Sequence, residues 1–416
     1  MNIILLCYAI SPTKGSEFAF GWDYVNALSK YHNVHLVYGV SGFKIGQTDD
    51  LINLFKKSPI ANIRLYPVRA NQKVLFFDSL NQFGLSWFWY IAFRHWHRDA
   101  KDVVQGILKE YSIDLVHTLN PIGFREPGYL WKFEKPHIWG PIGGANFVNF
   151  NLLMNHSRYD AFKFRLRNFI TTLQLLYSRR VHQSAKKSKA LIFSTSANLL
   201  SFQKYIGCEG LVIGETGFSL TRYKKSNVTY NGNEKLKMVW AGSISSRKNI
   251  RFLLEVISKC KFKERIELYL IGDGEKNEIS KLKEFSLKSG ISENIFWVGM
   301  KTRNETIDLF PDFHLHAITS LSEGNPQVLL ETLSVCLPTI ALDQDGMRDT
   351  LSGGLGFLIP ITDYYSTVNL FSQKIDEIIK NPNMLEITKN KIHDNRHRFS
   401  WDYKIIKFLK IYEESI

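Results

Sequence analysis

A short stretch of the sequence, residues 322–331, carries two carboxylates and a glycine at a spacing suited to holding a phosphorylated sugar. Glu323 and Glu331 are eight positions apart, and Gly324 lets a ligand approach the backbone closely. A helix starting near Pro326 would present free N–H groups to an anion. One carboxylate could then bind sugar hydroxyls while the other reaches ribose hydroxyls. The backbone between the two carboxylates belongs to Asn325, Pro326, Gln327 and Val328.

Two basic residues, Arg247 and Lys248, precede a segment with helical periodicity. Their charges and the positive end of the helix dipole would together favour a diphosphate. They end a loop that begins with Gly242 and Ser243 after an apolar run, and Gly272 opens a similar turn after the next run. A solvated basic turn explains the two cations equally well, and glycine turns after strands are common. Phosphate binding and a solvated turn therefore both remain open for this loop.

A further candidate loop lies near the amino terminus, where Gly15, Ser16 and Glu17 follow the first apolar run and open a helix. A Gly-Ser pair at a helix start presents N–H groups and a positive dipole end to an anion. A simple helix cap is at least as good an explanation of this loop by itself.

The elements that would position these loops are short apolar runs alternating with longer helical patterns, which is typical of parallel sheets covered by helices. We expect two α/β domains: residues 1–218, completed by 400–416, and residues 219–399. Open α/β sheets bind ligands at the carboxyl ends of their strands, so two facing sheets would enclose a cleft. The expected strands are residues 2–6, 34–38, 63–67, 115–117, 138–139 and 191–194, then 237–241, 266–271, 295–298, 315–318 and 339–342.

Bulk composition narrows the class of protein. A chain of 416 residues, 44% of them hydrophobic, is long enough for two domains with their own cores. The 53 basic and 39 acidic residues give a net charge of +14, which favours an anionic partner. The four cysteines form no C-x-x-C pair, which argues against a zinc site or a disulfide framework. No apolar run reaches the roughly 20 residues that cross a bilayer, and no signal-peptide pattern is present, so we expect a cytoplasmic protein.

The stretch E-G-N-P-Q-V-L-L-E resembles the E-x7-E motif of family 4 of the retaining glycosyltransferases, which have the GT-B fold of two Rossmann-like domains facing across a cleft. Other motifs agree in order. Residues 242–249 resemble the family's phosphate loop G-R-L-x-x-x-K-G, 270–274 its G-x-G turn, and 296–299 its F-x-G strand end. Residues 399–401 are similar to the segment that crosses back onto the first domain. The resemblance covers most of residues 236–416 and is looser before them.

The resemblance implies metal-independent, retaining transfer of a hexose-type sugar from a nucleoside-diphosphate sugar to a glycan acceptor, in cell-surface polysaccharide biosynthesis such as that of O-antigen or capsule. Glu323, Lys248 and Arg247 would be the catalytic residues, and no cofactor is expected. Glu323 would hold the hydroxyls of the donor sugar, and Glu331 those of the ribose. Ser243 stands where the family usually has a phosphate-binding arginine, and we expect Arg247 to replace that charge. The donor-binding residues would be Gly15, Ser16, Glu17, Gly242, Ser243, Gly272, Gly324, Asn325, Pro326, Gln327, Val328 and Glu331.

A basic, aromatic-rich region gives a hypothesis about the acceptor. Residues 158–189 hold nine basic residues against the single acid Asp160, with phenylalanines and leucines between them. Residues 79–93 are uncharged and rich in aromatics, and basic residues follow them from Arg94 onward. Such segments suit peripheral binding, through the first domain, to the anionic inner face of the cytoplasmic membrane, where a lipid-linked acceptor would lie. A buried core helix explains residues 79–93 equally well.

Other readings of the sequence remain open. A non-catalytic scaffold that binds sugar nucleotides, suggested by Ser243, and a GT-B-fold epimerase are the main alternatives. No nucleic-acid-binding module is recognisable, so we expect no nucleic acid partner. Residues 343–345 have the D-x-D form of a metal motif, and His314 and His316 share a strand face, but we expect no metal site. His117 is a fallback for the histidine that many family members have near the acceptor.

Overall fold

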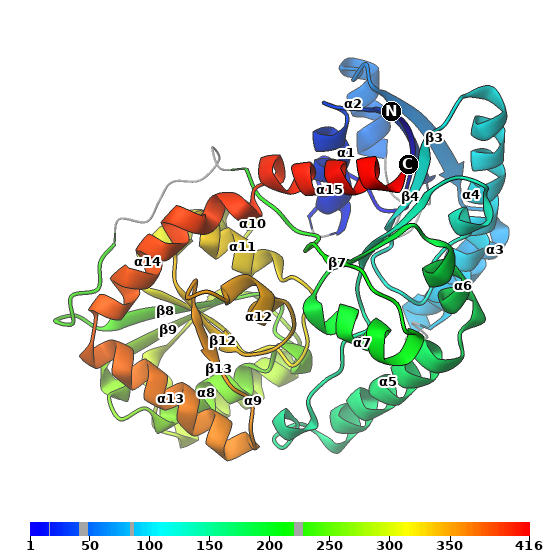
Figure 1. Cartoon of the computed structure of the whole chain (residues 1–416). Helices are drawn as coiled ribbons and strands as arrows, with labels where there is room; N and C mark the ends of the chain where they lie inside the picture. The colour runs from blue at the N-terminus through cyan, green and yellow to red at the C-terminus, as the bar shows by residue number, and fades with distance from the viewer. Residues whose placement is uncertain (16, 41–48, 84–86, 220–227) are drawn as a thin grey trace. The chain divides into compact units, whose positions relative to one another are not determined.

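The structure, a computed structural model, describes residues 1–15, 17–40, 49–83, 87–219 and 228–416. It divides into two compact units, each with one parallel sheet (Figure 1). The first unit contains Met1–Asn146, Thr171–Gly217 and Trp401–Ile416, and the second contains Phe147–Ile170 and Phe218–Ser400. Within the described ranges, no helix is both long and apolar enough to cross a membrane.

The sheet of the first unit has seven parallel strands: β1 (Asn2–Cys7), β2 (Asn33–Val40), β3 (Ile63–Arg69), β4 (Leu115–Asn120), β5 (His137–Ile142), β6 (Ala190–Phe193) and β7 (Leu211–Val212). Their order is β3-β2-β1-β4-β5-β6-β7. The first six lie where apolar runs predicted them, because strands covered on both faces are apolar along their length. The two-residue β7 was not predicted, and both of its residues are exposed. Open parallel sheets bind ligands where the strand order reverses, and in this sheet the order reverses between β1 and β4.

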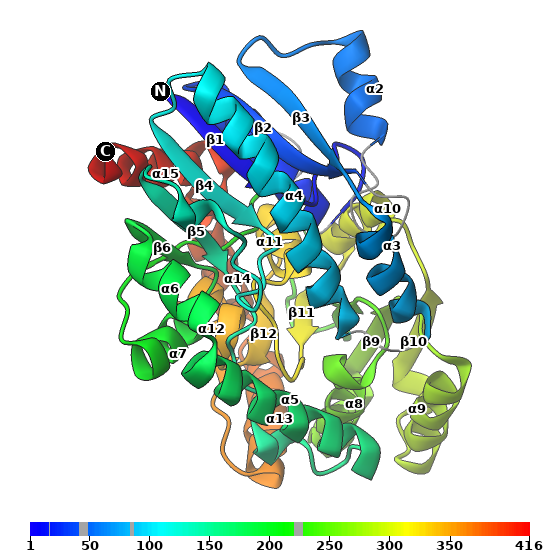
Figure 2. The same ribbon diagram turned by 90° about the vertical axis from the view of Figure 1, so that its right-hand side faces the viewer.

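Helices cover both faces of this sheet: α1 (Glu17–Leu28), α2 (Asp49–Lys57), α3 (Gln72–Ser79), α4 (Phe88–Glu110), α6 (Arg179–Lys187), α7 (Ser196–Ile206) and α15 (Trp401–Ser415). On one face α4 lies along the strands (Figure 2). Its residues Phe93 and Trp96 are buried in the core on that face. On the other face α15 packs against α1, with the rings of Tyr24 and Phe408 4.8 Å apart. In residues 79–93, predicted as an interfacial or a core helix, Phe83 is 78% exposed whereas Phe93 is buried in the core.

The sheet of the second unit has six parallel strands: β8 (Leu236–Ala241), β9 (Ile266–Ile271), β10 (Ile295–Gly299), β11 (Leu315–Ile318), β12 (Thr339–Leu342) and β13 (Phe357–Ile359). Their order is β10-β9-β8-β11-β12-β13, with the reversal between β8 and β11. All but the three-residue β13 lie where the sequence predicted them.

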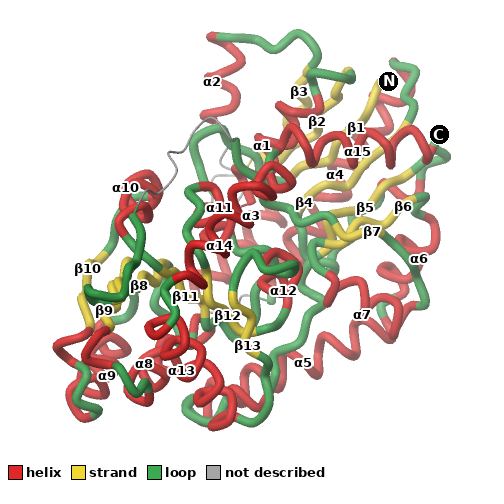
Figure 3. The backbone as a smooth tube through the Cα atoms, turned by 60° about the vertical axis from the view of Figure 1, so that its left-hand side comes forward, coloured by secondary structure: helices red, strands yellow, loops and turns green. Residues whose placement is uncertain are grey.

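The helices of the second unit are α8 (Ile250–Lys259), α9 (Lys276–Lys288), α10 (Arg303–Leu309), α11 (Gln327–Ser334), α12 (Asp345–Leu351), α13 (Tyr364–Lys380) and α14 (Asn383–Asn395). They flank the strands on both sides, as the colouring of Figure 3 shows. Phe252 of α8 and Phe371 of α13 meet edge to face, 5.9 Å apart, in the main core of this unit. The segments that follow β8, β9, β10, β11 and β12 carry the residues of the candidate site in this unit.

Residues 147–170, which the sequence assigned to the first domain, group with the second unit instead. Leu152 and Leu153 are buried in the core around β8 and α8. Asn151 Nδ2 donates to the carbonyl of Thr362 at 2.6 Å, and His156 Nε2 lies 3.0 Å from the carbonyl oxygen of Ser246. The helix that follows, α5 (Arg158–Tyr177), starts in the second unit and ends in the first. The second unit therefore includes a segment from the first half of the chain.

Candidate active site

Glu323, Lys248 and Arg247 meet at the carboxyl ends of β8 and β11. Lys248 Nζ donates to Glu323 Oε1 at 2.5 Å, and Arg247 Nη1 lies 2.8 Å from the same oxygen. Arg247 Nη1 also donates to the carbonyl of Ser322 at 3.0 Å. The two cations and the carboxylate are on separate loops that meet because β8 pairs directly with β11. The structure thus brings together the three residues that the sequence predicted as catalytic.

Hydrogen bonds to the backbone lock these two loops together. Leu321 N donates to the carbonyl of Arg247 at 2.8 Å. Thr319 Oγ1 lies within donating distance, 3.2 Å, of the carbonyls of both Lys248 and Asn249. Asn249 has a φ of 54°, a left-handed conformation that turns the chain from the basic loop into α8. The positions of both cations are therefore fixed by backbone contacts as well as by their own ion pairs.

The charge state of Glu323 follows from its surroundings. The residue is 9% exposed, and this burial by itself would raise the pKa of the carboxyl. The charges of Lys248 and Arg247 outweigh burial, and the pKa lies below its ordinary value. Glu323 is therefore ionised at neutral pH. Its carboxylate occupies a point where two cations converge, and a diphosphate would be stabilised at the same point.

Close backbone contacts between strand-end loops explain several of the glycines. A Cβ on Gly272 would lie 1.8 Å from the carbonyl oxygen of Gly242, and both residues have positive φ, 146° and 153°. A Cβ on Gly346 would lie 1.8 Å from the carbonyl oxygen of Gly324. No side chain fits at Gly272 or Gly346, so the loops after β8, β9, β11 and β12 form one continuous backbone surface. Ser243, the residue after Gly242, is exposed on it.

Glu331 lies on α11, whose first residue, Gln327, directly follows Pro326 as the sequence predicted. Glu331 is 6% exposed, and its Oε1 accepts a hydrogen bond from Arg303 Nε at 2.5 Å. Arg303 begins α10, the helix after β10. Sequence reasoning missed Arg303, although its place just after the F-W-V-G strand end could have pointed to it. The structure thus pairs the predicted ribose carboxylate with a cation whose side chain is 38% exposed.

The residues between the two carboxylates form the start of α11. Gly324, Asn325, Gln327 and Val328 are half-buried, and Pro326 is buried. Thr350 Oγ1 lies 3.4 Å from Asn325 Oδ1, which ties this loop to α12. The first turn of a helix leaves N–H groups that the helix itself does not pair. The role of this backbone in donor binding stays a prediction.

The side chains considered for metal binding have other partners. Asp343 Oδ1 accepts from Arg348 Nε at 2.7 Å, and Asp345 Oδ2 accepts from the backbone N–H of Glu323 at 3.1 Å. His316 has no exposed surface, and burial together with nearby Lys248 lowers its pKa to about 3, so it is neutral. Among the described residues, no group of three His, Cys, Asp or Glu side chains is placed to hold a metal ion. Asp345 is a supporting residue of the Glu323 loop that sequence reasoning did not identify.

The amino-terminal loop, residues 15–17, shows fewer features that would favour ligand binding. Gly15 is exposed, and a Cβ there would touch nothing within 4 Å, so close packing does not require glycine. Ser16, predicted as a donor-binding residue, lies outside the described residues. Glu17 starts α1, is half-buried, and accepts a hydrogen bond from the backbone N–H of Ile122 at 2.8 Å. Burial raises the pKa of its carboxyl despite this bond. Glu17 thus links the loops after β1 and β4.

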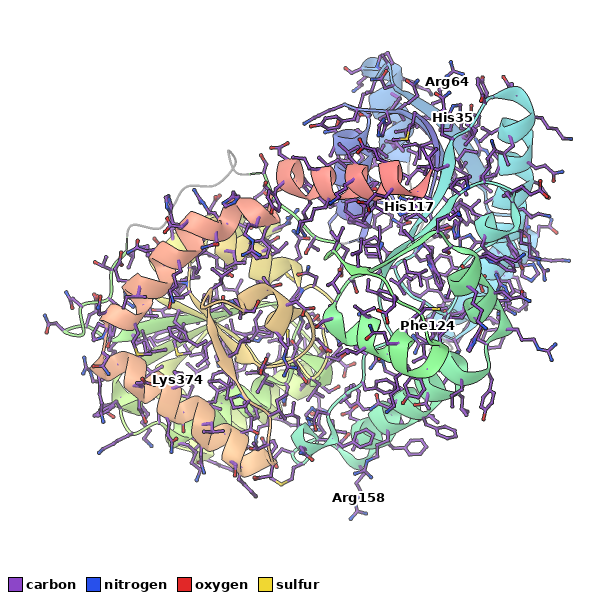
Figure 4. All side chains as sticks on the ribbon, viewed as in Figure 1. His35, Arg64, His117, Phe124, Arg158 and Lys374 are labelled. Carbon is purple, nitrogen blue, oxygen red and sulfur yellow. The ribbon has the colours of Figure 1, made fainter. Side chains whose placement is uncertain are left out.

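His117, the fallback for an acceptor-side histidine, is a core residue. Its Nε2 lies 2.7 Å from the carbonyl oxygen of Gly140, and its Nδ1 lies 2.6 Å from the hydroxyl of Tyr412. It has no exposed surface, and burial lowers its pKa to about 4. It lies on β4 where α15 packs (Figure 4). A side chain with no exposed surface cannot contact an acceptor, so this hypothesis was wrong, and His117 instead anchors α15.

Residues 222–395 match the family model of the glycosyl transferases group 1. The match falls within the second unit, which contains the Glu323 cluster and Glu331. No curated protein matches the sequence of this chain. The family match, together with the fold, supports a glycosyltransferase of group 1.

Solved structures show the same fold along the whole chain. The lipopolysaccharide outer core galactosyltransferase WaaB, in its apo form, is 16% identical with a TM-score of 0.62, and the match covers 100% of both chains. Anabaena HepE in complex with UDP is 14% identical with a TM-score of 0.59, covering 99% of this chain and 100% of that one. A glycosyltransferase from Rickettsia africae is 15% identical with a TM-score of 0.61, covering 100% and 98%. These likenesses show the fold alone, which consists of two Rossmann-like domains of the GT-B class, as the sequence predicted.

Proposed function

We propose that this chain is a retaining glycosyltransferase of family 4 that moves a hexose-type sugar from a nucleoside-diphosphate sugar to a glycan acceptor. The observation that carries the proposal is the convergence of Lys248 and Arg247 on Glu323 at the strand ends of the second unit. That unit is also the part of the chain that matches the group 1 family model.

The donor class follows from the charges of the site. Two cations on one loop, followed by the start of α8, suit the two phosphates of a nucleoside diphosphate. Glu331 and Arg303 offer a carboxylate for ribose hydroxyls and a donor for a phosphate or base edge. The related structure of HepE contains UDP, which supports a donor of this kind. In our proposal the cations of Arg247 and Lys248 provide the charge that a metal provides in other transferases, so no metal or other cofactor takes part.

Catalysis in this proposal is mainly electrostatic. The bond between the sugar and the diphosphate breaks early, leaving an oxocarbenium-like centre next to a developing dianion. Lys248 and Arg247 stabilise that dianion, and stabilisation of developing charge is often the largest catalytic contribution. Glu323, freed from the cations when the diphosphate takes its place, binds the hydroxyls of the donor sugar. The leaving phosphate accepts the proton of the acceptor on the same face, which retains the anomeric configuration.

We further propose that the acceptor is lipid-linked and that the enzyme works at the inner face of the cytoplasmic membrane, in the synthesis of a surface polysaccharide such as O-antigen or capsule. The net charge of +14 supports an anionic surface as a partner. The likeness to WaaB, described as a lipopolysaccharide outer core galactosyltransferase, supports an acceptor of this kind.

The test is incubation with a panel of nucleotide sugars, with and without lipid-linked glycan acceptors, while diphosphate release is measured. Release that depends on the acceptor is the expected result. Conversion of the donor sugar without any acceptor would instead indicate an epimerase, and a donor-dependent thermal shift without turnover would indicate a binding scaffold. Glu323→Gln should abolish acceptor-dependent release. Glu264→Gln is the matched control, because Glu264 is exposed and precedes β9, at the opposite end of the strand from the site.

A further inference from the structure

The helix α5 has apolar side chains on two opposite faces. One face is covered: Leu175 is buried, and Phe164 packs against the core of the second unit. The other face is open to solvent, and its apolar residues are between 39% and 65% exposed. We call these residues the α5 stripe: Tyr159, Phe162, Leu166, Phe169, Leu173 and Leu176.

The stripe is continuous along the helix. Its members are spaced alternately by three and four residues. At about 100° per residue, this spacing keeps all six side chains within roughly 100° of arc. A helix at the surface of a soluble domain normally presents polar residues on its open face, so a run of exposed phenylalanines and leucines marks an interaction surface.

Exposed cations flank the part of the stripe that belongs to the second unit. Arg158 and Arg165 lie along one edge of it and Lys163 along the other, and Arg158 points away from the helix into solvent (Figure 4). Lys163 Nζ lies over the ring of Tyr159, 4.0 Å from its centroid. Asp160 is the only acid in α5 and is tied to the first turn, where it accepts from Ser157 Oγ at 2.8 Å. The exposed face of this part of the helix is therefore apolar along its centre and positive on both sides.

An open groove of ≈ 640 Å³ runs beside the first turns of α5. Its lining combines exposed apolar side chains, among them Phe150, Met154 and Phe162, with the guanidinium groups of Arg158 and Arg165. The guanidinium carbon of Arg165 lies 5.6 Å from the ring centroid of Phe150. Asp363 is the one acidic residue of this lining, against two arginines, so the groove suits an amphiphile with an anionic head.

We propose that the α5 stripe is the surface through which the protein docks on an anionic lipid bilayer. Phenylalanine and leucine side chains would enter the boundary between headgroups and acyl chains, while Arg158, Lys163 and Arg165 reach the anionic headgroups. A second copy of the chain is a poorer occupant. A two-fold contact through the same surface would bring these cations against their own copies, where like charges repel. The inference rests on the proposed function only in giving docking a purpose, which is access to a lipid-linked acceptor.

Vesicle co-sedimentation tests the proposal, using the full chain and vesicles of phosphatidylglycerol with phosphatidylcholine. The parent protein should bind at low salt and bind at least tenfold less to vesicles of phosphatidylcholine alone. The double variant Phe162→Ser with Phe169→Ser should lose at least tenfold in partitioning to the anionic vesicles. The control is Leu287→Ser on α9, because Leu287 is a comparably exposed apolar residue, 69%, on another helix of the second unit. The control should bind as the parent does.

A second variant separates the two contributions. Arg158→Gln with Arg165→Gln should weaken binding to anionic vesicles at low salt and leave the residual binding at high salt unchanged. Parent-like thermal midpoints and nucleoside-diphosphate affinities in all variants would show that each is folded.

Three results would overturn the proposal: no vesicle binding by the parent, unchanged binding by the Phe162/Phe169 variant, or a parent dimer that this variant converts to a monomer without any vesicle binding. Diphosphate release with a water-soluble glycan acceptor is measured in parallel. If the parent protein bound vesicles but released no diphosphate with any acceptor, the proposed function would be contradicted and the docking surface would stand.

Discussion

Replacing Glu323 with glutamine removes one charge from the centre of the candidate site and leaves the shape of the side chain nearly unchanged. In the parent protein Glu323 Oε1 is 2.5 Å from Lys248 Nζ, and the side chains of these residues are only 10% and 14% exposed. Without the carboxylate, Lys248 remains largely buried beside a second cation, Arg247. The variant should therefore be less stable when no ligand is bound, and should have a higher affinity for a free diphosphate.

The size of the effect follows from the burial. Removing one partner of a buried ion pair costs about 3–5 kcal/mol. We take the lower end, about 3 kcal/mol, because the Arg247 side chain is 46% exposed and can turn toward water. For a domain of 150–250 residues, each kcal/mol lowers the thermal midpoint by about 2–4 °C, so the expected fall is about 6–12 °C. A nucleoside diphosphate should recover most of it, because the phosphates bring back negative charge beside both cations.

The same variant has a defined pH dependence. The pKa of Glu323 is lowered in the folded protein from an ordinary value of 4.5. The stability that the carboxylate contributes is therefore fully present above pH 4.5 and is lost as the pH falls through the folded pKa. The difference in thermal midpoint between the parent and Glu323→Gln should be constant near neutral pH and shrink in acid.

Differential scanning fluorimetry, run with and without a nucleoside diphosphate and over a range of pH, measures the loss of stability, its recovery by the ligand and its pH dependence. Glu264→Gln is the control. A Glu323→Gln variant that melts at the parent temperature would show that the ion pairs contribute little. A smaller diphosphate-induced shift than in the parent would refute the idea that the carboxylate occupies the phosphate position.

Three further predictions concern residues around the site and in the first unit. Glu331→Ala should lower donor affinity at least tenfold in a calorimetric titration, and full affinity in this variant would contradict the ribose assignment. Gly272→Ala should cost about 3 kcal/mol and disturb donor binding, because the new Cβ would lie 1.8 Å from the carbonyl oxygen of Gly242, and a parent-like midpoint on thermal denaturation would count against the backbone contact. Lys404 is 5% exposed, and burial lowers its pKa from 10.5 to about 8. The unfolded chain therefore binds more protons between these values, so stability should rise over this pH range by up to about 3 kcal/mol in the parent relative to Lys404→Met, as measured by urea unfolding.

The strands that position the site could be predicted because buried parallel strands are continuous apolar runs. β7 and β13 could not, since two or three residues carry no periodicity. Glu323, Lys248 and Arg247 could be identified because their motifs resemble those of a known family, and neighbouring strands then bring their loops together. Their mutual ion pairs were not predicted, because the sequence suggested which ligand each would bind and did not indicate that they satisfy one another without it.

Other features depend on tertiary packing that leaves no local signal. Residues 147–170 pack with the second unit, although the elements before and after them along the chain belong to the first. Arg303 and Asp345, which support Glu331 and Glu323, are the first residues of α10 and α12, whose sequences resemble ordinary helix starts. The phenylalanines and leucines of residues 158–189 carry the same local signal, and only the structure shows that one of them, Phe164, packs against the core. Amphipathic periodicity places a residue on a face of a helix, but it does not show which face is covered.

The central claim is that the chain transfers a sugar with retention, using Glu323 and the two cations beside it. The most direct test is proton NMR of the product formed from the nucleotide sugar that gives acceptor-dependent diphosphate release, read early in the reaction. The account predicts that the transferred sugar has the same anomeric configuration as in the donor, and that Glu323→Gln forms no product while still binding nucleoside diphosphate. An inverted product, or undiminished transfer by Glu323→Gln, would contradict it.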